Sequence, residues 1–120
     1  MEVTLSREFR FDAAQALAIF PKGHKCRRLH GHSFKLVVRV RGEINPDSGL
    51  LYDHAEIKRA VEPLLGILDH SYLNEIPGLE NPTIELMCVW LWERLRDQLA
   101  GLDEIALWET PGAWCRYQGK

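Results

Sequence analysis

Apolar and polar residues alternate in two stretches near the start of the chain, residues 2–12 and 33–43. In the first, one side carries Val3, Leu5, Phe9 and Phe11, and the other carries Thr4, Ser6, Glu8, Arg10 and Asp12. In the second, one side carries Phe34, Leu36, Val38 and Val40, and the other carries Lys35, Arg39 and Arg41. A period of two is typical of a strand with one buried face. The pattern therefore predicts that the chain opens with two strands.

Two later stretches have the spacing of amphipathic helices. The first follows a capping signal at Asp53 and Glu56, and Pro63 predicts a kink or a new start within it. Its apolar face consists of Ile57, Val61, Leu64, Leu65 and Leu68. The second helix is predicted over residues 82–99, with Pro82 in its first turn. Its apolar stripe consists of Ile84, Met87, Cys88, Leu91, Leu95 and Leu99.

The C-terminal residues predict two closing strands, 104–110 and 113–119. The order β-β-α-α-β-β indicates one α+β domain over residues 1–120, a four-stranded antiparallel sheet with two helices on one face. An open sheet has two edges, and bare edges pair with other chains. Either charged residues protect these edges or oligomerisation uses them.

Composition excludes several classes of protein. The 120 residues carry a formal net charge of −2, whereas a nucleic-acid-binding domain of this size is usually basic. No apolar run is long enough for a membrane span, and the N-terminal residues lack the apolar core of a secretion signal. The three cysteines cannot all pair within one chain. We therefore expect a reduced, cytoplasmic protein with free thiols that binds neither nucleic acid nor membrane.

Metal-capable side chains concentrate in the segment HKCRRLHGHSF, residues 24–34, which holds three of the five histidines. His30 and His32 are two residues apart on a predicted strand, so both imidazoles share one face and could bind zinc. Two solvated histidines at a strand end are the alternative, which this short motif alone favours. Zinc needs a third ligand, and the candidates by type are the end of the first strand, His24, Cys26, His54 and His70.

The three cysteines differ in their surroundings. Cys26 lies in a loop with four basic residues, Lys22, Lys25, Arg27 and Arg28. Cationic neighbours raise the thiolate fraction of a cysteine, so Cys26 is either a reactive thiol or a bystander. Cys88 falls on the apolar stripe of a helix, and we expect it in the core. Cys115, on the last predicted strand, is expected to be structural.

Two acidic residues are candidates for chemistry. Asp69 directly precedes His70 at a predicted helix end, where a carboxylate can orient an imidazole. An ordinary polar helix end is the alternative. Glu109 shares one face of its predicted strand with Ile105 and Leu107. An unpaired carboxylate on such an apolar face is costly. It could accept two parallel N–H donors from a ligand, or it could form a salt bridge to an arginine.

Six motifs in order carry a resemblance to a known family: FRFDAA, CRRLHGH, GLLYD, LDHSYLN, NPTIE and WET. The set resembles the 6-pyruvoyl-tetrahydropterin synthase family over residues 5–119. It is most similar to the bacterial 6-carboxy-5,6,7,8-tetrahydropterin synthases of queuosine biosynthesis. The resemblance implies the T-fold and a trimer-based homo-oligomer, a hexamer made of two trimers, whose sheets join into a barrel.

The resemblance also implies an activity and a set of site residues. It implies a lyase that uses Zn2+ to convert 7,8-dihydroneopterin triphosphate into 6-carboxy-5,6,7,8-tetrahydropterin, acetaldehyde and triphosphate. The positions that match the family's catalytic residues are Cys26, Asp69 and His70. Those that match its pterin-binding residues are Glu109 and Thr83, and those that match its zinc ligands are His30 and His32.

Gln15 departs from the family pattern, because the family has histidine there as its first zinc ligand. Three accounts follow: Gln15 ligates zinc through its amide oxygen, His24 or another histidine replaces it, or zinc is weakly held or absent. We expect a retained site, since the other motif residues are all present. His54 is a second departure, expected to be an exposed residue at a helix start.

Three alternative functions stay open. The first is the pyruvoyl-forming reaction, because the motif spacing does not separate the two products. The second is a non-catalytic pterin-binding homologue with a weakened metal site, which Gln15 alone motivates. The third is a purely structural zinc module, which would leave Asp69, His70 and Glu109 without a role.

Overall fold

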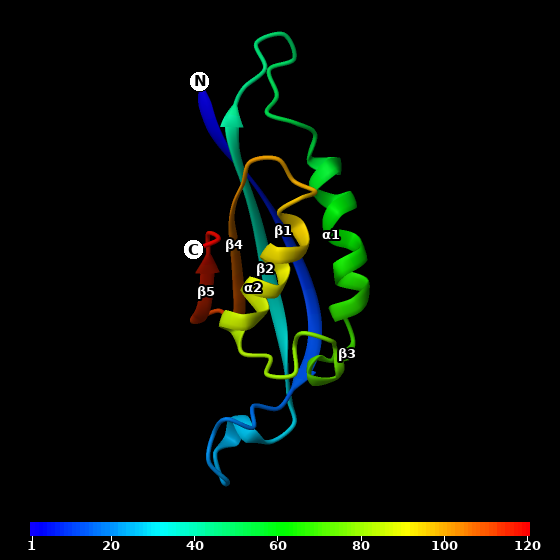
Figure 1. Cartoon of the computed structure of the whole chain (residues 1–120), viewed down its shortest axis with the longest axis vertical. Helices are drawn as coiled ribbons and strands as arrows, with labels where there is room; N and C mark the ends of the chain where they lie inside the picture. The colour runs from blue at the N-terminus through cyan, green and yellow to red at the C-terminus, as the bar shows by residue number, and fades with distance from the viewer.

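The computed structural model describes residues 1–120 and consists of one twisted sheet with two helices on the same face (Figure 1). The strands are β1 (Glu2–Gln15), β2 (His30–Glu43), β3 (Ser71–Tyr72), β4 (Leu102–Thr110) and β5 (Ala113–Tyr117). The α-helices are α1 (His54–Leu68) and α2 (Ile84–Leu95), and the short 3-10 turns are η1 (Lys25–Arg27) and η2 (Leu73–Glu75). The predicted α+β class with two helices is confirmed.

The prediction of a four-stranded, wholly antiparallel sheet is wrong. The sheet has five strands in the order β3-β1-β2-β4-β5, and β3 runs parallel to β1. β3 has only two residues, too few for any alternation of apolar and polar positions to be recognised. Its position depends on contacts with β1: the His70 backbone N–H donates to the Asp12 carbonyl over 2.6 Å.

The first helix begins at its predicted capping residue, whereas the second begins at Ile84, two residues after the predicted start at Pro82, because Thr83 caps it. The Asp53 carboxylate accepts from the Ala55 backbone N–H at 2.9 Å, and the Thr83 hydroxyl caps α2. Pro63 does not break α1, which is continuous from His54 to Leu68. Proline has no N–H, so Pro63 donates no helical hydrogen bond to the Arg59 carbonyl. Both residues are exposed, so water can bond to that carbonyl instead.

The core lies between the helices and the sheet as one cluster of 22 buried residues. The alternation in β1 and β2 is confirmed, since Phe11, Phe34, Leu36 and Val38 are all at most 3% exposed. Cys88 is fully buried in the same cluster, as predicted. No helix is both long and apolar enough to cross a membrane.

Tyr52 has a buried hydroxyl without a hydrogen-bond partner, and burial raises the pKa of this phenol to about 12. An unsatisfied buried polar group costs about 1–3 kcal/mol. Tyr52→Phe is therefore expected to raise the free energy of unfolding by about 1 kcal/mol, measured by urea denaturation. Tyr72→Phe, at a 37% exposed position, is the control and should change little. A destabilised Tyr52→Phe protein would show that the hydroxyl has a partner in solution.

The molecule is elongated, 58 × 23 × 23 Å, because β1 and β2 pair over their whole length from Glu2↔Glu43 to Gln15↔His30. Their connection, residues 16–29, carries η1 and lies beyond the ends of both helices (Figure 1). The helix-facing side of the sheet is therefore open at this end.

Candidate functional site

Strand register and alternation bring four of the predicted site residues to the same face of the sheet. Gln15 is opposite His30, and Ala13 is opposite His32, two positions beyond the core pair Phe11–Phe34. Glu109 continues the side of β4 that carries the buried Ile105 and Leu107. Strand side chains alternate in direction, so Gln15, His30, His32 and Glu109 all extend the core face toward the open end.

A cleft of about 580 Å³ lies at this end, within the range of small-molecule sites. Its walls come from the end of β1, the 16–29 loop, the start of β2, the start of α2 and the end of β4. Six predicted site residues line it: Gln15, Cys26, His30, His32, Thr83 and Glu109. Lys25 and Glu85 are the other charged residues of its lining.

The hydrogen bonds of His30 fix which of its ring nitrogens is free. Nδ1 lies 2.7 Å from the Arg28 carbonyl oxygen, which can only accept, so Nδ1 carries the proton. Nε2 then presents a lone pair into the cleft, 3.4 Å from the Gln15 amide nitrogen. A ring whose other N–H donates to a backbone carbonyl is the usual arrangement of a metal-binding histidine.

The surroundings of His32 shift the pKa of its imidazole. Burial lowers the pKa of its imidazole, and His30 acts in the same direction, while the Glu109 carboxylate opposes both. Its Nε2 lies 3.8 Å from Glu109 Oε2, and its ring meets that of His30 edge to face at 5.0 Å. A neutral imidazole can donate its lone pair to a metal ion without first losing a proton.

Gln15 is the most deeply buried polar residue of the site, only 1% exposed, and its Oε1 has no hydrogen-bond partner. Buried oxygens are nearly always satisfied, so an orphaned one on a side chain beside the His30 imidazole indicates a missing partner. A half-turn of the amide would direct this oxygen toward His30 Nε2. The donor set of two imidazole nitrogens and one amide oxygen therefore fits a zinc ion, with weaker binding than three imidazoles would give.

The other histidines do not complete this donor set. No three His, Cys, Asp or Glu side chains of the chain lie close enough together to hold a metal ion. The His24 ring instead stacks on Phe20, with ring centres 4.2 Å apart. His54 is exposed at the start of α1, as predicted, and its backbone carbonyl accepts from Arg7 Nη1 at 2.8 Å. Gln15 is therefore the third ligand that the geometry favours.

Cys26 lies on η1, and its backbone N–H and carbonyl are both hydrogen-bonded. Its N–H donates to His24 Nδ1 at 3.0 Å, and its carbonyl accepts from the Leu17 N–H at 2.8 Å. The basic residues around it are not equivalent: Arg27 Nη1 donates to the Ala18 and Phe20 carbonyls, both at 2.8 Å. Arg27 thus holds the loop together, and Lys25 is the cation available to a ligand in the cleft.

Two further predicted site residues line the cleft: Thr83, the N-cap of α2, and Glu109, on β4. The Thr83 hydroxyl oxygen accepts from the Leu86 N–H at 3.2 Å, so its own proton stays available to a ligand. Glu109 has no arginine partner in the structure, and its recorded ionic neighbour is His32. The predicted alternative, a salt bridge from Glu109 to an arginine, is therefore wrong for this fold.

Asp69 and His70 form the predicted pair, but the structure places them outside the cleft. Asp69 Oδ2 lies 3.0 Å from His70 Nδ1, so the ring donates from Nδ1 and leaves Nε2 free. The Asp12 backbone N–H bonds to Asp69 Oδ1 at 2.9 Å and is the main cause of the lowered pKa of that carboxyl. His70 has φ 57°, an uncommon conformation for a residue other than glycine.

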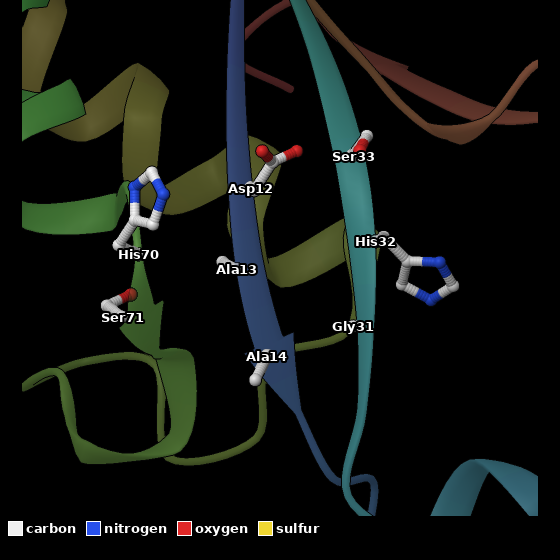
Figure 2. Close-up of a pocket in the computed structure, with 8 residues that line it drawn as sticks. All are labelled: Asp12, Ala13, Ala14, Gly31, His32, Ser33, His70 and Ser71. Carbon is white, nitrogen blue, oxygen red and sulfur yellow. The ribbon is translucent and has the colours of Figure 1, made fainter.

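The His70 side chain is 80% exposed and lies on the far side of β1 from His32 (Figure 2). A shallow hollow connects the two regions across the sheet surface, lined by Asp12, Ala13, Ala14, Gly31, His32, Ser33, His70 and Ser71. Neither Asp69 nor His70 contributes to the cleft that holds Cys26. Within one chain, the Asp69–His70 pair and the Cys26 thiol are therefore separated.

Several residues that shape the site were not among the predicted site residues. Asn74 stabilises the turn after Gln15. Its Oδ1 accepts from the Ala16 N–H at 3.0 Å, and its Nδ2 donates to the Ala16 carbonyl at 2.7 Å. The apolar wall of the cleft consists of Leu17, Ile19, Phe20 and Ile84. The run ALAIF, residues 16–20, was the available signal for this wall, because apolar residues in a loop need a surface to cover.

A sheet that gathers a thiol, two imidazoles and a carboxylate in one cleft at its strand ends defines an enzyme-like small-molecule site. The chain belongs to the 6-pyruvoyl tetrahydropterin synthase family, whose profile matches residues 4–120. The resemblance seen in the motifs is thereby confirmed.

Individual relatives carry different names. The chain is 38% identical to the 6-carboxy-5,6,7,8-tetrahydropterin synthase of Synechocystis sp. over 117 residues, which cover 92% of this chain and 89% of that protein. It is 40% identical to the dihydroneopterin monophosphate aldolase of Pyrococcus furiosus over 102 residues, 82% of each chain. Among solved structures, the 6-pyruvoyl tetrahydropterin synthase of Caenorhabditis elegans superposes with a TM-score of 0.91 at 27% identity, covering 100% of this chain and 97% of that one.

Proposed function

We propose that the protein converts 7,8-dihydroneopterin triphosphate and water into 6-carboxy-5,6,7,8-tetrahydropterin, acetaldehyde and triphosphate, as a step toward queuosine. The observation that carries this proposal is the gathering of Cys26, His30, His32 and Glu109 in one cleft. The similarity to the Synechocystis protein of that name supports the carboxy-forming reaction over the pyruvoyl-forming one.

Each residue has a role that follows from its chemistry. The Glu109 carboxylate accepts hydrogen bonds from the 2-amino group and ring N–H of the pterin, and Thr83 donates to the ring from the other wall. The Cys26 thiolate removes a proton from the substrate's side chain as a general base. Lys25, which lines the cleft, faces the phosphates.

His30, His32 and Gln15 would hold the zinc ion. When bound, zinc supplies a Lewis acid that polarises the hydroxyl groups of the substrate's side chain. The lone pair of His30 Nε2 and the lowered pKa of His32 both favour binding of the ion.

Asp69 and His70 move the second proton, and they come from a neighbouring chain. β1 is paired on its outer side only at Ala13 and Ala14, so residues 2–11 form a long free edge, and β5 is the other edge. Free edges favour pairing with further copies, in agreement with a trimer-based homo-oligomer. The exposed Nε2 of His70 is then available to a partner's cleft.

This arrangement predicts complementation between two inactive variants. Cys26→Ala and His70→Ala are each expected to lack turnover, and a protein refolded from a 1:1 mixture should regain it. If every site takes Cys26 from one chain and His70 from a neighbour, random assembly leaves both residues intact in about a quarter of the sites. Refolding each variant alone is the control. A mixture as inactive as its components would contradict the shared site.

Product analysis tests the proposed reaction. The protein, supplied with Zn2+, is incubated with 7,8-dihydroneopterin triphosphate, and the pterin and any trapped aldehyde are identified by mass. Acetaldehyde together with the carboxylated tetrahydropterin supports the proposal, whereas the pyruvoyl product without acetaldehyde overturns it. Tight binding of the pterin without any product would indicate a non-catalytic homologue.

The relative from Pyrococcus furiosus favours a second candidate, aldol cleavage of dihydroneopterin monophosphate. Within one chain the cleft offers a single cation, Lys25, which matches one phosphate better than three. The same assay with the monophosphate separates the two candidates. Cleavage between the two hydroxyl-bearing carbons would release 6-hydroxymethyl-7,8-dihydropterin and glycolaldehyde phosphate in place of acetaldehyde.

A further inference from the structure

The turn that carries Cys26 is too short to position the thiol by itself. η1 has three residues, and its ends depend on bonds to other parts of the chain. On one side, the Cys26 carbonyl accepts from the Leu17 N–H at 2.8 Å, two residues beyond Gln15. On the other side, the Cys26 N–H donates to the His24 ring at 3.0 Å. The direction of the Cys26 side chain therefore depends on His24.

His24 occupies the N-cap of this turn, with φ −69° and ψ 134°. Asn, Asp, Ser and Thr are the usual N-caps because a short side chain returns an acceptor to the second or third N–H. Here the acceptor is Nδ1 of an imidazole, which must be unprotonated to accept the bond. The His24 carbonyl also accepts from the Arg27 N–H at 3.0 Å, which closes the turn.

The orientation of the His24 ring is fixed by stacking. It lies over Phe20 with ring centres 4.2 Å apart and planes 12° from parallel. Phe20 also lines the cleft, and its carbonyl accepts from Arg27. The imidazole thus has two contacts: it accepts a hydrogen bond from Cys26, and it stacks on Phe20, which lines the cleft.

Two other roles for His24 do not fit the structure. His24 does not form a metal-binding group with His30 and His32. It is also absent from the lining of the cleft, so it does not reach a bound substrate in this chain. Its contact with the chemistry passes through the backbone of Cys26.

We propose that His24 is a positioning residue that orients the Cys26 thiol for proton abstraction. This inference rests on the proposed function, because it assigns Cys26 to the reaction. The acceptor atom is the essential feature: Asn can place Oδ1 where Nδ1 lies, whereas Phe keeps the stacking surface and lacks the acceptor.

The test compares wild type with His24→Asn and His24→Phe, all in a Cys115→Ser background so that the other partly exposed thiol is removed. His24→Phe is expected to lower kcat about tenfold with little change in KM, and His24→Asn to keep most of the wild-type kcat. Alkylation of Cys26 by iodoacetamide, followed by peptide mass, reports the thiol directly. It should be faster in His24→Phe, where the turn is released, and near the wild-type rate in His24→Asn.

The possible outcomes distinguish a positioning role of His24 from a role in proton transfer, a role in zinc binding and no role. A His24→Asn protein as slow as His24→Phe would overturn the proposal and indicate that the imidazole itself transfers a proton. Loss of bound Zn2+ in His24→Asn would overturn it in favour of a ligand role. Wild-type kcat and alkylation in His24→Phe would show that the cap is dispensable. If wild type has no turnover, the proposed function fails, and the alkylation rates still decide whether His24 orients Cys26.

Discussion

Cys26→Ala is expected to abolish turnover of the pterin substrate, with kcat lowered by about 10²–10⁴, the usual contribution of a positioned general base. KM should change little, because the contacts proposed to bind the pterin come from Glu109 and Thr83. Cys26 lines the same cleft as both imidazoles, and its backbone N–H and carbonyl are both hydrogen-bonded. Steady-state kinetics with the preferred phosphorylated dihydroneopterin measures the effect.

Cys115→Ala is the matched control for Cys26→Ala. Cys115 is also a partly exposed free cysteine, but it lies on β5, away from the cleft. Its replacement should leave kcat and KM near wild type. A Cys26→Ala protein that keeps more than about a tenth of wild-type kcat would remove this residue from the proposed role, since a base contributes more than that.

His30→Ala is expected to abolish Zn2+ binding at the site, and turnover with it. It removes both the lone pair at Nε2 and the ring fixed by the Arg28 carbonyl. Loss of an outer hydrogen-bond partner alone weakens metal binding by about 10- to 100-fold, so loss of a ligand should cost at least that much. Competition with a chromophoric chelator measures the affinity independently of activity.

Gln15→His tests the unusual third position of the same site. An imidazole is a better zinc ligand than a neutral amide oxygen, so this variant should bind Zn2+ more tightly than wild type. His54→Ala, at an exposed position outside the cleft, serves as the control and should bind like wild type. Equal zinc affinity in wild type, His30→Ala and Gln15→His would contradict a metal site formed by these residues.

The helix and strand elements follow from local patterns in the sequence. Alternation along residues 2–12 and 33–43 identified the two long strands, because a strand with one buried face needs apolar residues at every second position. The caps at Asp53 and Thr83 place the helix starts through bonds to backbone groups only two or three residues away. The Asp53 cap was predicted because this interaction is short in sequence, whereas the second helix begins at Ile84, two residues after the predicted Pro82.

The ends of the elements were predicted less well. β1 and β2 continue to Gln15 and His30, beyond the alternating stretches, because each supplies the other's backbone partners as far as that pair. α2 ends at Leu95, four residues before the predicted Leu99, which nonetheless remains buried. Pairing and packing between distant segments decided these boundaries.

The sequence determined which side chains could do chemistry, and the tertiary structure decided which of them meet. Gln15 and His30 are neighbours because antiparallel register places the last residue of β1 beside the first of β2. Asp69 and His70 lie outside the cleft because β3 pairs with the far side of β1. His24 acts on Cys26 through a ring nitrogen whose direction depends on stacking with Phe20. Each of these depends on the strand register or on a side-chain contact fixed by the folded loop, and such relations between segments leave no local pattern in the sequence.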